Sequence, residues 1–243
     1  MNTLYVVGIG PGNPEGMTVE AVRTIERAEV IAGYQVYVDL VRPLFPDKEF
    51  IVTPMHQETE RCRMAINSAM SGKSTAVVCS GDAGVYGMAG LVLTLAEGIS
   101  DLEVIVISGV TAALSGAALL GAPLGHDFAV ISLSDLLTPW EKIEKRLELA
   151  AEADFCISLY NPASRKRADY LEKACDILLR HASPDTACGV VRNIGRDGQT
   201  VHTMRLSELR TYRADMFTTV FIGNSQTVLT GGRMVTPRGY RTV

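Results

Sequence analysis

Short apolar runs alternate with amphipathic segments along the first half of the chain. Strand-like apolar runs occupy residues 4–9, 30–32, 50–53, 76–79 and 104–107. Segments with helical periodicity lie between them, at residues 18–28, 34–41, 58–70 and 88–97. Because the strand-like runs are continuously apolar, they predict a mainly parallel sheet that is covered on both faces.

For two of these helices, the sequence indicates the N-cap or the buried face. Thr18 is a candidate N-cap, and Val19, Val22 and Ile25 repeat at helical spacing behind it. In the helix at 58–70, the inward face is predicted to consist of Cys62, Ile66, Ala69 and Met70.

The second half starts the alternation again with a different order of elements. Strands are predicted at residues 129–132, 155–160, 187–191, 199–204 and 218–222. Thr138, Pro139 and Glu141 form a helix-start pattern, with Thr138 as the N-cap. The polar loop 192–198 between two strands indicates an antiparallel pair, so this sheet is predicted to be mixed. We expect two α/β domains, residues 1–120 and 121–243, with a glycine-rich linker at 121–125.

Residues 80–87 (SGDAGVYG) follow a predicted buried strand and precede a predicted helix. Glycine permits close approach of another group and positive φ, and ligands bind beyond the carboxyl ends of strands in open parallel sheets. Asp82 is the one charged residue of the segment. The segment is therefore either a ligand-binding turn or a tight turn with a capping aspartate.

Residues 8–14 (GIGPGNP) resemble a dinucleotide-binding fingerprint but do not match it. The pattern G-x-G-x-x-G requires glycine where Asn13 stands. Pro11 and Pro14 also lack the amide donors that a pyrophosphate needs at a helix start. A nicotinamide or flavin enzyme is disfavoured.

Composition narrows the class of protein. The 243 residues are 47% hydrophobic with a formal net charge of −4, which disfavours a nucleic-acid partner. Five scattered cysteines without a C-x-x-C motif indicate free thiols in a reducing compartment, and the four histidines have no metal-ligand spacing. No apolar run reaches the roughly 18 residues of a membrane span. We expect a cytoplasmic protein with no membrane partner and no protein-bound metal.

Basic residues gather at Arg165-Lys166-Arg167 and in the tail, at Arg233, Arg238 and Arg241. They form either solvated faces or a recognition surface for the carboxylates of an anionic ligand, which the planar guanidinium fork matches.

Several motifs resemble those of one family. GIGPG at 8–12, GDAGVYG at 81–87 and GVTAA at 109–113 resemble the tetrapyrrole methylases, and the resemblance covers essentially the whole chain. More specific segments are SLSDLLTPW at 132–140, LYNP at 159–162 and RNIGR at 192–196. They resemble the branch that methylates C17 of precorrin-3B or cobalt-factor III.

This resemblance implies an S-adenosylmethionine-dependent methyltransferase of cobalamin biosynthesis, built of two α/β domains with the active cleft between them. It implies a tetrapyrrole substrate, a homodimer, and methylation that accompanies contraction of the macrocycle. The alternative within the superfamily is methylation at another ring position. A relative acting on ribosomal RNA is disfavoured by the acidic charge, and a tetrapyrrole carrier without catalysis is a further alternative. Whether the acceptor contains cobalt stays open.

The resemblance also implies which residues line the cofactor site. They are Pro11, Gly81, Asp82, Val85, Thr111, Ala112, Tyr160, Asn161 and Ile194. Val85 and Ile194 are equally compatible with ordinary core packing. Arg61, Arg63 and Arg192 are candidate cations for the acceptor's carboxylates, with solvated charges as the alternative.

Ring contraction moves protons, so a general acid or base is expected. The candidates at the start of the second domain are His126, Ser132, Ser134 and Asp135. His126 is equally compatible with a linker histidine, and Asp135 with a cap for the loop before Thr138.

Overall fold

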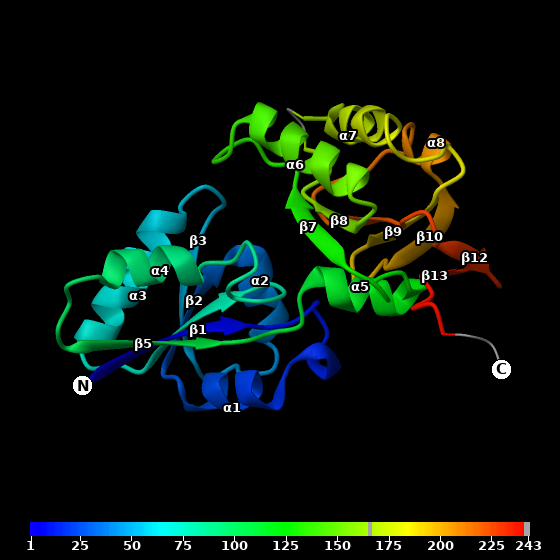
Figure 1. Ribbon diagram of the computed structural model, residues 1–243. Coiled ribbons are helices and arrows are strands. Elements are labelled where there is room, and N and C mark those ends of the chain that lie inside the picture. Colours follow the sequence, from blue (N-terminus) through cyan, green and yellow to red (C-terminus); the bar gives the residue numbers. More distant parts are fainter. Residues whose placement is uncertain (165–166, 241–243) are drawn as a thin grey trace. The chain divides into compact units, whose positions relative to one another are not determined.

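The computed structural model describes residues 1–164 and 167–240 (Figure 1). The chain divides into two compact units, Met1–Ala112 and Ala113–Val243. The sequence predicts the division after residue 120. The helix that starts at Ala112 thus falls almost wholly within the second unit.

The first unit is built on a parallel sheet with the strand order β3-β2-β4-β1-β5. Its strands are β1 (Asn2–Gly8), β2 (Val30–Tyr34), β3 (Glu49–Thr53), β4 (Thr75–Cys79) and β5 (Leu102–Ile107). Its helices are η1 (Pro14–Gly16), α1 (Val19–Arg27), α2 (Gln35–Val41), α3 (Glu58–Met70) and α4 (Ala89–Ala96). The predicted parallel sheet is confirmed.

Helices cover both faces of this sheet. Side chains of α3 and α4 pack with Leu4, Val6 and Val77 on one face, and those of α1 and α2 pack with Val7 and Val78 on the other. Successive strand residues point to opposite faces, so a strand buried on both sides must be apolar throughout. Burial on both faces therefore explains why the strand segments of the first half are continuously apolar.

In the first unit, the predicted start of α1 is correct, but the predicted faces of α1 and α3 are only partly correct. The Ala21 N–H donates to Thr18 Oγ1 at 3.1 Å, which confirms the predicted N-cap. Val19, which repeats at helical spacing with Val22 and Ile25, is 65% exposed, and the buried residues of α1 are Ala21, Thr24 and Ile25. On α3, Met70 is exposed, so its predicted place on the inward face is wrong, and Arg61 is buried.

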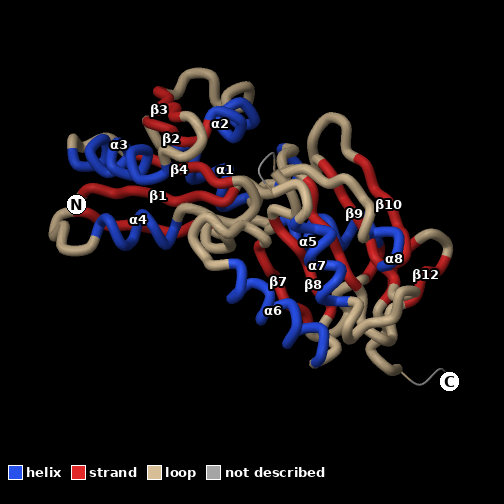
Figure 2. The backbone as a smooth tube through the Cα atoms, turned by 90° about the horizontal axis from the view of Figure 1, so that it is seen from above, coloured by secondary structure: helices blue, strands red, loops and turns tan. Residues whose placement is uncertain are grey.

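The second unit contains a mixed sheet with the strand order β10-β9-β11-β8-β7. Its strands are β7 (Phe128–Ser132), β8 (Cys156–Tyr160), β9 (Ala187–Arg192), β10 (Thr200–Arg205) and β11 (Thr218–Ile222). The pair β7–β8 is parallel and the other pairs are antiparallel; β9 and β10 lie side by side in Figure 2. The predicted mixed sheet and antiparallel pair are confirmed.

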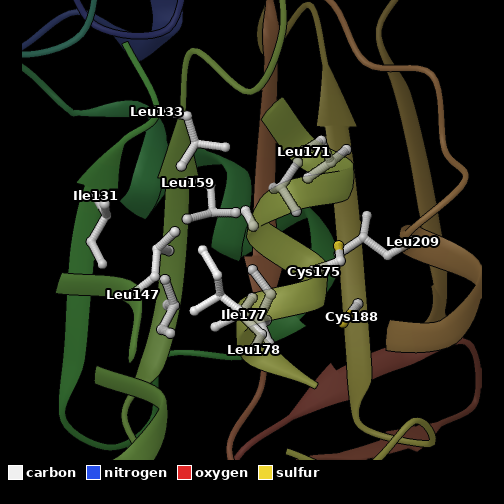
Figure 3. Packing of buried hydrophobic residues seen from close by; sticks show 14 of the residues in the cluster. Ile131, Leu133, Leu147, Leu159, Leu171, Cys175, Ile177, Leu178, Cys188 and Leu209 are labelled. Carbon is white, nitrogen blue, oxygen red and sulfur yellow. The ribbon is translucent and has the colours of Figure 1, made fainter. Parts of the chain in front are cut away.

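One face of this sheet carries the main core of the second unit. Its helices are α6 (Trp140–Glu152), α7 (Tyr170–Leu178) and α8 (Leu206–Leu209). Figure 3 shows Leu147, Leu171, Cys175 and Leu178 of these helices against Leu159 of β8. The α6 helix begins at Trp140 with Pro139 as N-cap and no side-chain cap, so the expected role of Thr138 as N-cap is wrong.

The opposite face is covered by α5 (Ala112–Leu120) and a small sheet. A Cβ on Gly116 of α5 would lie 2.7 Å from the Phe221 ring of β11, so glycine lets the helix approach the strand closely. The small sheet contains β6 (Gly121–Ala122), β12 (Val228–Thr230) and β13 (Arg233–Val235). Because β6 pairs with β13, the expected linker at residues 121–125 contains a strand.

Among the residues that the structure describes, no helix is both long and apolar enough to cross a membrane.

Candidate functional site

In the first unit, three glycine-containing turns meet at the carboxyl ends of the neighbouring strands β4, β1 and β5. The turns after β1 and β4 are joined by two backbone hydrogen bonds, Gly10 N–H to Gly81 O at 3.0 Å and Gly81 N–H to Gly10 O at 2.7 Å. This edge of a parallel sheet is where ligands bind in open α/β folds.

Gly8 is required because the three turns touch one another. A Cβ at Gly8 would lie 2.7 Å from both Gly109 N and Gly81 O, closer than real Cβ atoms come. At Gly8, the neighbouring backbone itself takes the space.

Gly81 differs from Gly8 because a Cβ there would find room. Its φ of +71° favours glycine, whereas a Cβ would meet nothing nearer than Thr111 Cα at 3.5 Å, an ordinary van der Waals distance. The conformation of the turn therefore requires glycine at Gly81, which is itself buried beside the turn after β5.

Asp82 holds two of the turns together. Its Oδ1 accepts the N–H groups of Gly84 at 2.8 Å and Val85 at 3.2 Å, and its Oδ2 accepts the Gly109 N–H at 2.9 Å. The carboxylate thus links the turn after β4 to the turn after β5. Of the two readings of Asp82, the structure supports a role within the turn.

The other expected cofactor residues of the first unit lie on these same turns. Pro11 follows β1, Val85 follows β4, and Thr111 and Ala112 follow β5. All are partly buried.

In the second unit, Ser132 and Tyr160 end the parallel neighbours β7 and β8, and Asn161 follows Tyr160. Asn161 Nδ2 donates to Ser132 Oγ at 3.0 Å, and the Ser134 N–H donates to the same oxygen at 3.2 Å. Tyr160 Oη accepts the Ala113 N–H at 2.6 Å, which satisfies an amide of the first turn of α5. Ser132, Tyr160 and Asn161 thus form a polar edge at the carboxyl ends of β7 and β8, in which Ser132 and Asn161 are directly hydrogen-bonded.

Asp135 takes part in a contact that the sequence analysis missed. The Tyr170 hydroxyl donates to Asp135 Oδ2 at 2.7 Å, and Arg167 Nε lies 3.8 Å from Asp135 Oδ1. The hydrogen bond to the carboxylate raises the pKa of Tyr170 above its ordinary value. The Tyr170 ring also lies 4.5 Å from the Trp140 ring, centroid to centroid. No sequence spacing joins residues 135 and 170, so only the fold reveals this pair.

His126 does not join this group. It lies between β6 and β7, before the amino end of β7, whereas Ser132 ends that strand and Asp135 follows it. Its Nδ1 lies 3.8 Å from Asp127 Oδ2. The strand β7 separates His126 from Ser132 and Asp135, so the structure does not bring the three candidate residues together.

Ile194 lies after β9 and is buried in the second unit. A Cβ built on Gly116 would lie 3.0 Å from Ile194 Cδ1, so this side chain packs against α5. Of the two alternatives for Ile194, cofactor contact and core packing, its side chain therefore has the packing role.

The three candidate cations have different surroundings. Arg192 Nε donates to Asp215 Oδ2 at 2.6 Å, so its charge is paired. Burial would raise the pKa of Asp215, but its hydrogen bonds with Arg192, Thr218 and the Phe217 N–H lower it overall. Arg63 is exposed, whereas Arg61 is buried. Of the basic clusters, Arg165, Lys166 and Arg241 lie outside the described residues.

All five cysteines are free and buried. Burial raises the pKa of Cys62 to about 11 and that of Cys79 to about 12, so these thiols are not nucleophiles at neutral pH. Within residues 1–164 and 167–240, no three histidine, cysteine or acidic side chains gather into a group that could hold a metal ion.

Known proteins resemble this chain over nearly its whole length. A "Probable cobalt-factor III C(17)-methyltransferase" of Salmonella typhimurium is 48% identical, covering 98% of this chain and 99% of the relative. A "Precorrin-3B C(17)-methyltransferase" of a Sinorhizobium species is 42% identical, covering 93% and 90%. The crystal structure of the methyltransferase CobJ has a TM-score of 0.90 and 34% identity, covering 98% of this chain and all of that one.

The family model described as tetrapyrrole (corrin/porphyrin) methylases matches residues 3–210. These residues include all three glycine turns of the first unit and the polar edge of β7 and β8 in the second. The chain belongs to the tetrapyrrole methylases.

Proposed function

We propose that this protein is an S-adenosylmethionine-dependent methyltransferase that methylates C17 of cobalt-factor III or precorrin-3B, with contraction of the macrocycle, in cobalamin biosynthesis. The observation that carries the proposal is the sequence identity of 48% and 42%, over more than nine-tenths of the chain, to relatives named for that reaction. The rival is a methyltransferase of the same family that acts at another ring position.

The turns of the first unit fit the cofactor. S-adenosylmethionine supplies an electrophilic methyl group, which reacts when donor and acceptor are held in line and water is excluded. The glycine-containing turns at the carboxyl ends of β1, β4 and β5 lie where open parallel sheets bind ligands, and Asp82 links the turns after β4 and β5. We assign Pro11, Gly81, Val85, Thr111 and Ala112 to cofactor contact and Asp82 to positioning.

The remaining expected cofactor residues belong to the second unit. Tyr160 and Asn161 lie on its polar edge, whereas the Ile194 side chain packs against α5. A cofactor contact at Ile194 would therefore use its backbone. All three stay predictions from the family resemblance.

For the proton transfers we propose Ser132 and Asp135. The Tyr170 hydroxyl holds its proton toward the Asp135 carboxylate, so this pair offers a proton at a defined atom. The Ser132 oxygen is oriented by two hydrogen bonds. His126 has no comparable support.

The test offers the purified protein labelled S-adenosylmethionine with either cobalt-factor III or precorrin-3B. We expect one of the two to gain a methyl group at C17 and a contracted ring, identified by mass spectrometry and NMR. A methylated but uncontracted product, or a methyl group at another carbon, would favour the rival.

We also propose that the protein is a cytoplasmic homodimer. The free, buried cysteines suit a reducing compartment. Strand β5 is an outer strand of its sheet, and its Val106 is 42% exposed. An exposed apolar edge strand readily pairs with another chain, so β5 is our candidate for the surface between two copies.

A further inference from the structure

Arg61 is a buried cation whose contacts are all with neutral groups. Its Nε donates to Thr53 Oγ1 at 2.9 Å and its Nη2 to Pro54 O at 3.0 Å, while its Nη1 lies 3.9 Å from Met88 Sδ. Its guanidinium carbon lies 6.0 Å from the Tyr34 ring centroid. These contacts orient the side chain but carry no negative charge.

Among the described residues, the positive charge of Arg61 has no counterion. Only 4% of the residue is exposed, and in the part of the chain that the structure describes no carboxylate lies within ion-pair distance of it. Glu58, one turn away on α3, instead accepts the His56 N–H at 3.2 Å. A guanidinium has five N–H donors, more than these contacts use. Buried charges in proteins are normally paired, so this one needs an explanation.

The location of Arg61 indicates what would pair with it. Tyr34 ends β2, Thr53 ends β3, and Met88 follows the glycine turn after β4. These strands are neighbours in the parallel sheet, so Arg61 lies at their carboxyl ends. Ligands of open parallel sheets bind at this edge.

We propose that Arg61 is a specificity residue that binds a carboxylate side chain of the tetrapyrrole acceptor. The inference rests on the proposed function, because it names the acceptor's acetate or propionate groups as the missing anion. So little of the residue is exposed that the site would take one slender acidic side chain and not the face of the macrocycle. The planar fork suits bidentate pairing with a carboxylate.

The test compares Arg61→Met and Arg61→Lys with Arg23→Met. Arg23 is an exposed arginine on α1 of the same unit, so it is a matched control for the loss of one positive charge from a helix. For each variant we would measure KM for the acceptor that the wild type methylates, the Kd for S-adenosylhomocysteine by calorimetry, and the Tm.

Arg61→Met should raise the acceptor KM about tenfold to a hundredfold, because a hydrogen-bonded charged pair is lost. Arg61→Lys should recover part of this loss, since it keeps the charge but not the fork. The Kd for S-adenosylhomocysteine should change less than about twofold in both variants. Arg23→Met should match the wild type in all three measurements.

An unchanged acceptor KM in Arg61→Met would overturn the inference. So would a parallel loss of acceptor binding, S-adenosylhomocysteine binding and Tm, since that pattern indicates a purely structural arginine. If the wild type methylates neither acceptor, the proposed function itself fails, which is a distinct outcome.

Discussion

At the scale of single residues, Asp82 shows how one side chain holds a site together. Its two oxygens accept three backbone N–H groups from two different turns. A hydrogen bond to a charged group contributes about 1.5–3 kcal/mol, which is more than a neutral one does. The residue itself was identifiable from the sequence, but its partner Gly109 was not, because residues 27 positions apart meet only in the fold.

Asp82→Asn should therefore lower both the stability of the protein and its affinity for S-adenosylhomocysteine, even though the side chain keeps its shape. An amide offers one acceptor oxygen and one donor group, so either Gly109 N–H or the Gly84 and Val85 N–H groups would face a donor. We expect a loss of about 1.5–3 kcal/mol in the free energy of unfolding and about tenfold weaker binding of S-adenosylhomocysteine.

Urea denaturation and calorimetry measure these two effects. Asp101→Asn is the control, because Asp101 is an exposed acidic residue of the same unit whose side chain contacts Asn2. Wild-type stability and affinity in Asp82→Asn would contradict the positioning role.

At the scale of elements, helix α5 depends on a residue far along the chain. Its small residues let it approach β11, as the contact between Gly116 and Phe221 shows. Its first turn donates the Ala113 N–H to Tyr160 Oη. The residue that satisfies this first turn lies 47 residues away, and the family resemblance implies that it contacts the cofactor instead.

Removal of the Tyr160 hydroxyl should destabilise the start of α5. We expect Tyr160→Phe to lower the free energy of unfolding by about 0.5–1.5 kcal/mol, the net value of one neutral hydrogen bond, or more if the amide stays buried without a partner. Chemical denaturation is the measurement, with the exposed Tyr240 changed to Phe as a control. If the two variants have equal stability, the hydrogen bond does not support the helix.

At the scale of the whole molecule, the main sheets of the two units differ in strand direction. All strand pairs of the first sheet are parallel, whereas the second sheet combines one parallel pair with antiparallel pairs. Each sheet has outer strands, and exposed apolar edges invite pairing with another copy. The edge at β5 is the one we propose for dimerisation.

We expect light scattering to show a dimer, and Val106→Lys to shift it toward monomer, because a charged side chain on an edge strand opposes pairing. Val201→Lys is the matched control: Val201 is 39% exposed on β10, an outer strand of the second sheet. A monomeric wild type, or equal dissociation of both variants, would contradict the proposed surface.

The strands of the two large sheets, the helices between the strands of the first unit, the parallel and mixed character of these sheets, and the glycine turns were determined by the sequence alone, whereas β6, β12, β13 and α8 were not predicted. These features depend on local periodicity and on glycine, which act over a few residues. The fold alone decided the burial of Arg61, the link from Asp82 to Gly109, the Tyr170–Asp135 pair and the pairing of β6 with β13. Each of these joins residues distant along the chain, and no local pattern encodes which distant groups will meet once the sheets are packed.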